Sequence, residues 1–279
     1  MRDINSGAIV FNLSGGAILI TVFAYMGFAF FHTDIVAPCT ARYPAGKQFA
    51  LDSQRGNLLT PIELQGRAGS REWGILTNAQ ILGSGAGNDA VMQVSLASTD
   101  VDDETARNGV GFTWQSAELA KATSACLSYR VFLPASFAFA KPGYLPGLYA
   151  ASDIAELDAK TPSDGYVARV GWAQGGGSGV EVRSVGAGTL WQGATVESGP
   201  WPLGRWVPVE QEIALNSKGA GDGILRLWID GKLRIENRSL ALKSDSSPGF
   251  SGVVADIGYA HSAGDPVTLK VSPFVVQWQ

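Results

Sequence analysis

The chain has 279 residues, a formal net charge of −4 and 16% charged residues, and it contains 35 glycines and 13 prolines. This composition favours many short strands joined by tight turns over a helical protein. No basic stripe is visible, so nucleic acid is not expected as a partner. The two histidines and two cysteines lack the spacing of a zinc site, so we expect no metal centre and no other cofactor.

The N-terminal segment has the composition of a membrane anchor. No charged residue occurs from Ile4 to Phe31. As a helix, residues 8–31 would span about 36 Å, enough to cross a hydrocarbon core of about 30 Å. We therefore predict that residues 1–33 form one transmembrane helix, which contacts the lipid bilayer through residues 8–31. A cleavable signal peptide is the alternative. Both predict that the rest of the chain lies outside the cytoplasm, in the periplasm or at the cell surface.

The segment after the anchor lacks a regular pattern. Residues 34–70 mix proline, glycine and isolated charges without a sustained period, which predicts a juxtamembrane linker to a folded domain at residues 71–279. Cys39 and Cys126 have two interpretations. In an exported domain they are candidates for a disulfide, and otherwise they are two unpaired thiols. The residues alone leave both open.

Short apolar or alternating runs follow one another through the rest of the chain. The dipeptide Asp230-Gly231 between two such runs is a strong hairpin signal. Because no amphipathic helices separate the runs, the pattern indicates an all-β sandwich or jelly roll. The segments that we predict to be strands are 75–82, 90–96, 111–114, 126–133, 165–172, 180–185, 206–215, 223–230 and 267–278.

The stretch Lys141–Tyr149 combines two prolines and two glycines between apolar runs. Proline fixes φ and glycine permits angles that other residues avoid, so we interpret this stretch as a shaped connection. It would hold Lys141, Tyr144 and Tyr149 in set directions. In the next run, alternation places Val167 and Arg169 on the face opposite Tyr166.

Several of these segments together resemble polysaccharide lyase family 14. The resemblance covers residue 90 to the C-terminus and includes the elements K-x-G-x-L-P-G-L and D-G-x-L-x-L-W-x-D-G, which begin at Lys141 and Asp222. It implies a concanavalin A-like β-jelly roll. It also implies β-elimination on a uronate-containing polysaccharide, in which the C5 proton is removed and the 4-O-glycosidic bond breaks. Such a reaction needs a cation for the carboxylate, a base for the proton and an acid for the leaving oxygen.

The resemblance implies roles for individual residues. Lys141, Tyr144 and Arg169 take the catalytic positions. The usual reactive residues are partly replaced, since the family pattern has a lysine at Tyr144 and a serine at Val167, and it has a Tyr-x-Tyr pair in the strand that here begins at Val180. The side chains that we expect to bind substrate are Arg130, Tyr149, Tyr166, Arg183 and Arg226.

Two functional hypotheses follow. The first is a membrane-anchored, exported protein that binds an acidic polysaccharide and cleaves it by β-elimination. The second is a non-catalytic carbohydrate-binding or structural subunit that uses the jelly roll to interact with a membrane protein complex. The retained prolines and glycines fit both hypotheses, and the replaced reactive side chains favour the second.

Overall fold

The computed structural model divides the chain into two units, Met1–Ala37 and Pro38–Gln279. The predicted membrane anchor at residues 8–31 lies outside the described residues except for Thr21, so it stays a prediction. Within the described part of the chain, no helix is long and apolar enough to cross a bilayer. The structure describes residue 21 and residues 36–53, 56–83, 90–96, 108–158, 162–193, 199–260 and 267–279.

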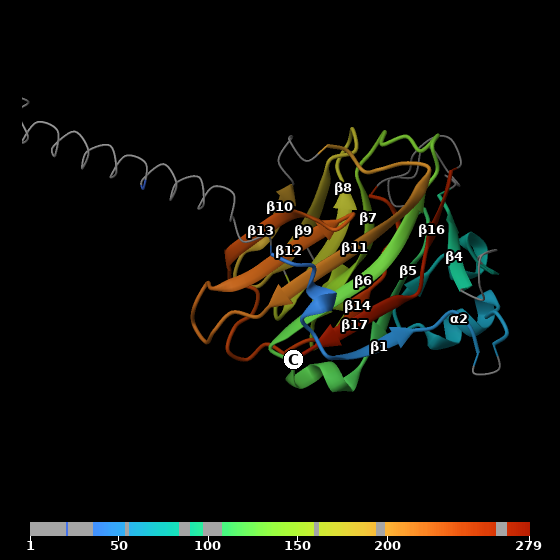
Figure 1. The fold of residues 1–279 in the computed structure, drawn as a ribbon. Helices are drawn as coiled ribbons and strands as arrows, with labels where there is room; N and C mark the ends of the chain where they lie inside the picture. The colour runs from blue at the N-terminus through green and yellow to red at the C-terminus, as the bar shows by residue number, and fades with distance from the viewer. Residues whose placement is uncertain are drawn as a thin grey trace, which may run out of the picture. The chain divides into compact units, whose positions relative to one another are not determined.

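The second unit is a sandwich of two antiparallel β-sheets (Figure 1). Apolar side chains from the inner faces of both sheets pack into a shared core, which includes Leu127 and Val131 from one sheet and Val170 and Val182 from the other. This architecture confirms the predicted all-β sandwich. Each sheet therefore also has an outer face, on which alternate side chains lie.

In the described residues one sheet has nine strands and the other has eight. The nine-stranded sheet runs in the order β13 (Lys232–Leu240), β12 (Gly223–Ile229), β11 (Arg205–Ala214), β6 (Ser124–Leu133), β16 (Thr268–Val271), β4 (Ala90–Ser95) and β3 (Ala79–Gly83), while β17 (Phe274–Trp278) pairs with β6 and with β1 (Ala45–Phe49). The eight-stranded sheet runs in the order β10 (Gly188–Gly193), β9 (Ser178–Ser184), β8 (Tyr166–Trp172), β7 (Gly143–Ala150), β14 (Gly252–Val254), β5 (Gly111–Gln115) and β2 (Glu72–Trp73), while β15 (Gly258–Tyr259) pairs with β7.

Short helices connect some of these strands. The predicted strand at 75–82 is wrong at its start, because a helical turn follows Gly74, whose φ is 71°. The predicted hairpin is confirmed, since Asp230 and Gly231 join β12 to β13 with φ values of 57° and 71°. The helices are η1 (Cys39–Ala41), α2 (Pro61–Arg67), α3 (Ile75–Asn78), η2 (Ala117–Lys121) and η3 (Ile154–Asp158).

Residues 38–70 differ from the predicted linker, because they belong to the folded unit. Strand β1 pairs with β17 along its whole length, and Phe49 stacks on Phe274 with ring centroids 5.0 Å apart. Leu64 of α2 is buried in the same core. A five-residue edge strand has too few residues to show a period of its own, and pairing with the distant C-terminal strand orders it.

The proline- and glycine-rich stretch is mostly strand β7, so its interpretation as a connection is wrong. The register between β7 and β8 shifts between Leu145 and Leu148, which makes Pro146 and Gly147 a bulge. A Cβ atom at Gly147 would clash with the carbonyl oxygen of Ala168. Glycine is therefore required where the two backbones approach most closely.

Side chains from the opposite sheet satisfy the polar groups around this bulge. The buried Gln211 of β11 accepts a hydrogen bond from the Leu148 amide at 2.9 Å and donates one to the Ala168 carbonyl, also at 2.9 Å. The Tyr129 hydroxyl donates to the Pro146 carbonyl at 3.1 Å. The bulge thus depends on hydrogen bonds across the core, which compensate for the interrupted ladder.

Replacing Gln211 with leucine is expected to lower the free energy of unfolding by about 2–4 kcal/mol, because it leaves a buried N–H and a buried C=O unpaired. Gln80→Leu is the matched control, since Gln80 lies exposed on β3 and its replacement should change stability by less than about 0.5 kcal/mol. Urea denaturation followed by tryptophan fluorescence measures both variants. If Gln211→Leu were as stable as Gln80→Leu, the hydrogen bonds of Gln211 would not be needed to stabilise the bulge.

Candidate functional site

The residues that the resemblance assigns to catalysis meet in part on the outer face of the eight-stranded sheet. Arg169 of β8 lies opposite Glu181 of β9 in the strand register. The Tyr144 hydroxyl of β7 donates a hydrogen bond to Glu181 Oε2 at 2.8 Å, and the Arg169 guanidinium lies 5.7 Å from the centre of the Tyr144 ring. Period-two alternation on three neighbouring strands produces this grouping.

Arg169 is 2% exposed, and acceptors surround its guanidinium. Its Nε donates to Asp256 Oδ2 at 2.6 Å, and its Nη2 donates to the Leu157 carbonyl at 2.9 Å. Its Nη1 lies 3.5 Å from Glu181 Oε1. Three acceptors on three sides satisfy this cation without an external anion.

These contacts continue into a larger group of charges, which we call the buried ion network. Arg71 forms ion pairs with Asp256 at 2.8 Å and with Asp158 at 2.9 Å. Arg183 lies 3.2 Å from Glu181 and donates to the Leu157 carbonyl at 2.8 Å. The network consists of Arg71, Asp158, Arg169, Glu181, Arg183 and Asp256.

Helix η3 covers this part of the sheet. The Leu157 side chain is fully buried in a small apolar cluster with Tyr149, Val167 and Val254. Its carbonyl accepts from Arg169 and Arg183 at the same time. The segment therefore lies against the guanidinium groups of Arg169 and Arg183.

Burial also changes the acid–base properties of the site. Desolvation raises the pKa of Tyr144 well above its ordinary value, and the negative charge of Glu181 raises it further. Burial alone would also raise the pKa of Asp256, but the guanidinium groups of Arg169 and Arg71 outweigh it and hold that pKa below its usual value. Tyr144 is thus held as a neutral phenol, while Asp256 stays charged.

The lowered pKa of Asp256 predicts how stability depends on pH. A carboxyl whose pKa is lower in the folded state stabilises the fold above its unfolded pKa of about 4, and this contribution is lost as the pH falls toward the folded pKa. We expect the free energy of unfolding to decrease as the pH is lowered from about 5 to 3, and to decrease less steeply in Asp256→Asn. Urea denaturation across this range tests the expectation, and parallel curves would contradict it.

The third residue that we expected to be catalytic, Lys141, lies apart from the buried ion network. Lys141 precedes β7 and is exposed, and its backbone carbonyl accepts a hydrogen bond from Trp172 Nε1 at 3.0 Å. Within the described residues its side chain makes no hydrogen bond or ion pair. The structure therefore brings Tyr144 and Arg169 together and leaves the Lys141 ammonium outside the buried ion network.

The five residues expected to bind substrate occupy three environments. Tyr149 lies beneath η3, and Arg183 belongs to the buried ion network. Tyr166 faces the core, where its ring meets Phe250 edge-on with centroids 6.0 Å apart, so it reaches neither outer face. Arg130 and Arg226 lie on the outer face of the nine-stranded sheet, opposite the catalytic set.

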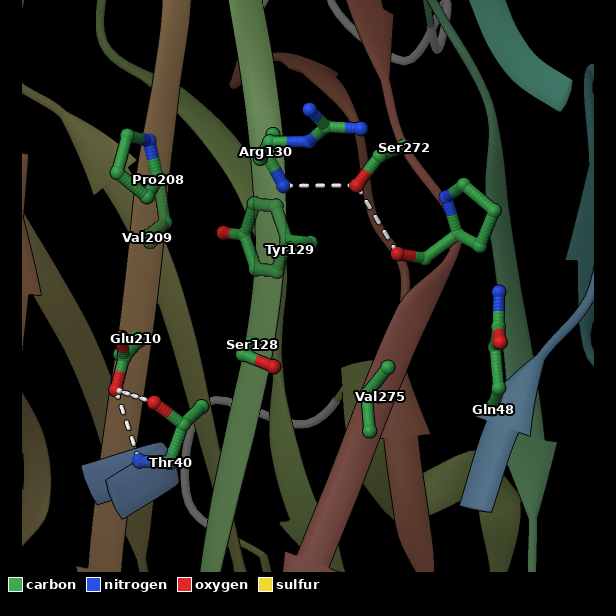
Figure 2. Close-up of a pocket in the computed structure, with 11 residues that line it drawn as sticks. Thr40, Gln48, Ser128, Tyr129, Arg130, Pro208, Val209, Glu210, Ser272 and Val275 are labelled. Carbon is green, nitrogen blue, oxygen red and sulfur yellow. Dashed lines mark hydrogen bonds between the residues drawn. The ribbon is translucent and has the colours of Figure 1, made fainter. Parts of the chain in front are cut away.

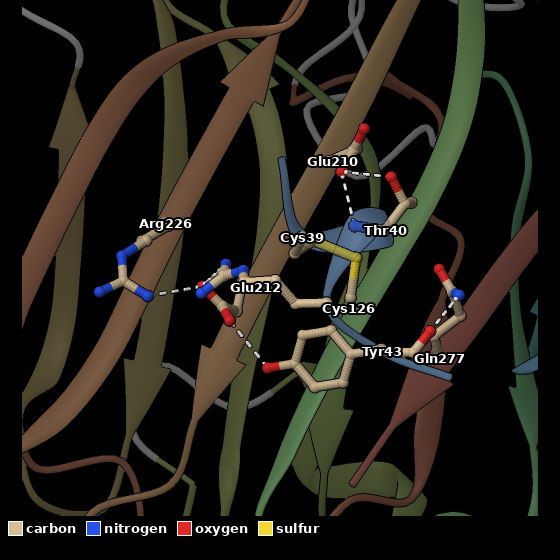
Figure 3. Close-up of a disulfide and its surroundings, with 9 residues drawn as sticks. Cys39, Thr40, Tyr43, Cys126, Glu210, Glu212, Arg226 and Gln277 are labelled. Atoms are coloured by element: carbon tan, nitrogen blue, oxygen red, sulfur yellow. Dashed lines mark hydrogen bonds and ion pairs between the residues drawn. A yellow bond between two sulfur atoms is a disulfide. The ribbon is translucent and has the colours of Figure 1, made fainter. Parts of the chain in front are cut away.

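The two cysteines form a disulfide on this second outer face, with Cα atoms 5.8 Å apart (Figure 3). Beside it the buried Glu212 carboxylate accepts from Arg226 and Arg42 at 2.7 Å each and from the Tyr43 hydroxyl at 2.8 Å. Figure 3 shows Arg226 and Tyr43 reaching this carboxylate. Arg226 is therefore part of a structural ion cluster next to η1.

In the described residues one group of potential ligand atoms lies close together, namely Cys39, Cys126 and Glu210. Both sulfur atoms belong to the disulfide, so they are not thiolate ligands. This group therefore does not fit a metal ion.

Comparisons with known proteins agree with this fold. The profile of the family Polysaccharide lyase 14 matches residues 85–183, which contain Tyr144, Arg169 and Glu181. The chain resembles polysaccharide lyase family 14. The matched residues include strands β7 and β8 and strand β9 up to Arg183, which carry the candidate site. The positions at which this chain differs from the family pattern therefore lie within the matched region.

Solved structures show the same likeness in fold. The marine PL-14 alginate lyase from Aplysia kurodai is 13% identical with a TM-score of 0.64, and the match covers 85% of this chain and 99% of that chain. Alginate lyase vAL-1 from Chlorella virus is 13% identical with a TM-score of 0.59, over 78% and 96% of the two chains. An endo-beta-1,4-glucuronan lyase from the fungus Trichoderma reesei is 13% identical with a TM-score of 0.50, over 76% and 90%. No curated protein matches the sequence.

We call the outer face of the eight-stranded sheet that carries Tyr144 and Arg169 the lyase-like face. Sequence reasoning missed three residues of the ion network on this face, namely Arg71, Asp158 and Asp256. Asp256 had a detectable signal, because it is a carboxylate within the otherwise apolar run Val253–Ile257. Such a residue requires a buried counter-charge or exposure to water. Arg71 lies in an irregular segment and Asp158 is the last residue of the short helix η3, and neither has a sequence pattern that assigns it to a face.

Proposed function

We propose that this chain is an exported, polysaccharide lyase-like protein that binds a uronate-containing polysaccharide without cleaving it. The observation that carries the proposal is the state of Arg169, whose buried guanidinium is paired with Asp256 and covered by the Leu157 carbonyl. Because this guanidinium is buried and already paired with protein carboxylates, a substrate carboxylate has no access to it.

The chemistry of β-elimination supports the absence of cleavage. Removal of the C5 proton becomes feasible when a cation neutralises the neighbouring carboxylate and a base is poised to accept the proton. Here the candidate cation, Arg169, already donates hydrogen bonds to Asp256 and to the Leu157 carbonyl. The Tyr144 phenol donates a hydrogen bond to Glu181, and its raised pKa opposes the deprotonation that its use as a base would require.

The polysaccharide class comes from the resemblance. Several structural relatives are alginate lyases, and one solved structure holds a variant of alginate lyase Aly36B in complex with alginate trisaccharide. A fold whose active relatives recognise acidic chains is a suitable scaffold for retaining binding after loss of the reaction. An acidic polysaccharide is therefore the proposed ligand.

The Cys39–Cys126 disulfide supports export, because disulfides persist in oxidising compartments outside the cytoplasm. We further propose that the predicted anchor at residues 8–31 holds the domain at the membrane on its periplasmic or outer side. There it would retain polysaccharide close to the bilayer, and a membrane protein complex is a suitable neighbour.

Affinity electrophoresis of the full chain in mild detergent tests this function. We expect slower migration in gels that contain alginate or glucuronan than in gels with neutral dextran, and no decrease in the size of the polymer on long incubation. Unchanged migration in both acidic gels would contradict binding and favour a structural subunit. A shortened polymer would contradict the absence of cleavage.

A further inference from the structure

A groove on the outer face of the nine-stranded sheet is separate from the lyase-like face. It lies between β11, β6 and the segment that joins β16 to β17, and its volume is about 360 Å³. This volume is at the lower end of the range for ligand sites in proteins. Figure 2 shows Arg130 and Ser128 on β6 and Glu210 on the neighbouring strand β11, with Thr40 next to Glu210 and Gln48 on the far side.

The groove arises from an interruption in the sheet. Strand β6 pairs with β16 near Val131 and with β17 near Ser128, and Ser272 and Pro273 separate the two partner strands. The Ser272 hydroxyl accepts from the Arg130 amide at 2.8 Å and donates to the Pro273 carbonyl at 3.0 Å. These bonds fix the interruption, so a hollow is maintained beside the outward side chains of β6.

The groove presents both a cation and a hydrogen-bond acceptor. Arg130 is exposed on β6. On β11, Glu210 Oε2 accepts from the Thr40 amide at 3.0 Å and from its hydroxyl at 3.1 Å, which orients the carboxylate. Within the described residues Glu210 Oε1 makes no hydrogen bond. The disulfide next to Thr40 holds η1 against the sheet and closes this end of the groove.

An aromatic surface continues the groove at its other end. Phe132 and Trp206 face each other across β6 and β11 with ring centroids 5.7 Å apart. The Arg130 guanidinium lies 5.7 Å from the Trp206 ring centre. One row of the sheet surface therefore offers an apolar ring, then a cation, then hydroxyl and carboxylate acceptors. Sugar chains present apolar ring faces and polar edges in the same alternation.

We propose that this groove is the binding site for the acidic polysaccharide, and this inference rests on the function proposed above. One uronate unit places its carboxylate on Arg130 and donates a hydrogen bond from a hydroxyl group to Glu210, while the adjoining unit packs its apolar face on Trp206. Glu210 lies opposite Ser128, so it is a diagonal neighbour of Arg130 across β6 and β11. Such positions are about 7–8 Å apart, which suits the carboxylate and the far hydroxyls of one hexuronate ring. A neutral sugar lacks the carboxylate with which a guanidinium forms its strongest, charge-assisted hydrogen bonds.

Isothermal titration calorimetry of the full chain with alginate and glucuronan hexasaccharides tests the site. Arg130→Gln and Trp206→Ala are each expected to weaken binding at least tenfold. Arg238→Gln is the matched control, because Arg238 lies on β13 outside the groove and its side chain is 58% exposed. It removes the same charge and should leave binding within twofold of wild type. Thermal melting verifies that every variant is folded.

The outcomes separate the two proposals. Wild-type affinity in both groove variants would overturn the groove assignment and leave polysaccharide binding intact. No binding by the wild-type chain would overturn both. Equal weakening in Arg238→Gln would also overturn the assignment, because it would show a diffuse charge effect. Equal affinity for maltohexaose would contradict the role given to the uronate carboxylate.

Discussion

Replacement of Asp256 by asparagine is expected to destabilise the protein by about 3–5 kcal/mol, because it removes one partner from a buried ionic group. Asp256 accepts from Arg169 at 2.6 Å and from Arg71 at 2.8 Å, and its side chain is 9% exposed. Asparagine keeps the size of the side chain and removes its charge. Two guanidinium groups would then remain buried with too little negative charge around them.

Asp158→Asn is the matched control, since Asp158 also pairs with Arg71 but its side chain is 41% exposed. Water screens that pair, so its loss should lower stability by no more than about 1 kcal/mol. Urea denaturation of both variants measures the difference. If the two variants were equally stable, the network would not be the buried structural element described above.

Loss of the disulfide is expected to lower the free energy of unfolding by about 4–5 kcal/mol, from the entropy of closing a long loop in the unfolded chain. Cys39 and Cys126 are 87 residues apart, and Cys39 lies in η1, outside the regular sheet ladder. The double variant Cys39→Ser with Cys126→Ser removes the link. Denaturation of oxidised wild type and of the variant, both without reductant, gives the difference.

Reductant supplies the control for this prediction. Dithiothreitol should lower the stability of the wild type toward that of the double variant and leave the variant unchanged. A wild type that is as stable with reductant as without it, after the thiols have been shown to react, would contradict the predicted contribution of the disulfide.

Much of the architecture follows from local pattern. Alternation at 126–133 and 165–172 indicates strands because apolar side chains must recur every second residue to reach the core. The hairpin at Asp230-Gly231 is equally local. Strand β1 and the β7 bulge were not predictable in this way. Pairing with β17 orders the first, and hydrogen bonds from Gln211 and Tyr129 across the core support the second.

The candidate site shows a second limit of sequence reasoning. Alternation correctly places Arg169 and Tyr166 on opposite faces of one strand. It does not show to which of the two sheets a strand belongs, so it cannot tell which outward side chains lie on the same outer face. Arg130 and Arg183 have the same local pattern, and they lie on different sheets. The covering of Arg169 by Leu157 depends on the five-residue helix η3, which is too short to show a period in the sequence, so only the assembled fold reveals it.

We propose that the chain's own residues close the lyase-like face, so that it does not catalyse elimination. The most direct measurement is the ultraviolet absorbance of the unsaturated product during incubation of the full chain with alginate and with glucuronan, beside an active alginate lyase as a positive control. We predict no increase with either polymer while the control reacts. A steady increase that disappears in Tyr144→Phe would contradict the account, because it would show that the face opens and that its phenol takes part in the reaction.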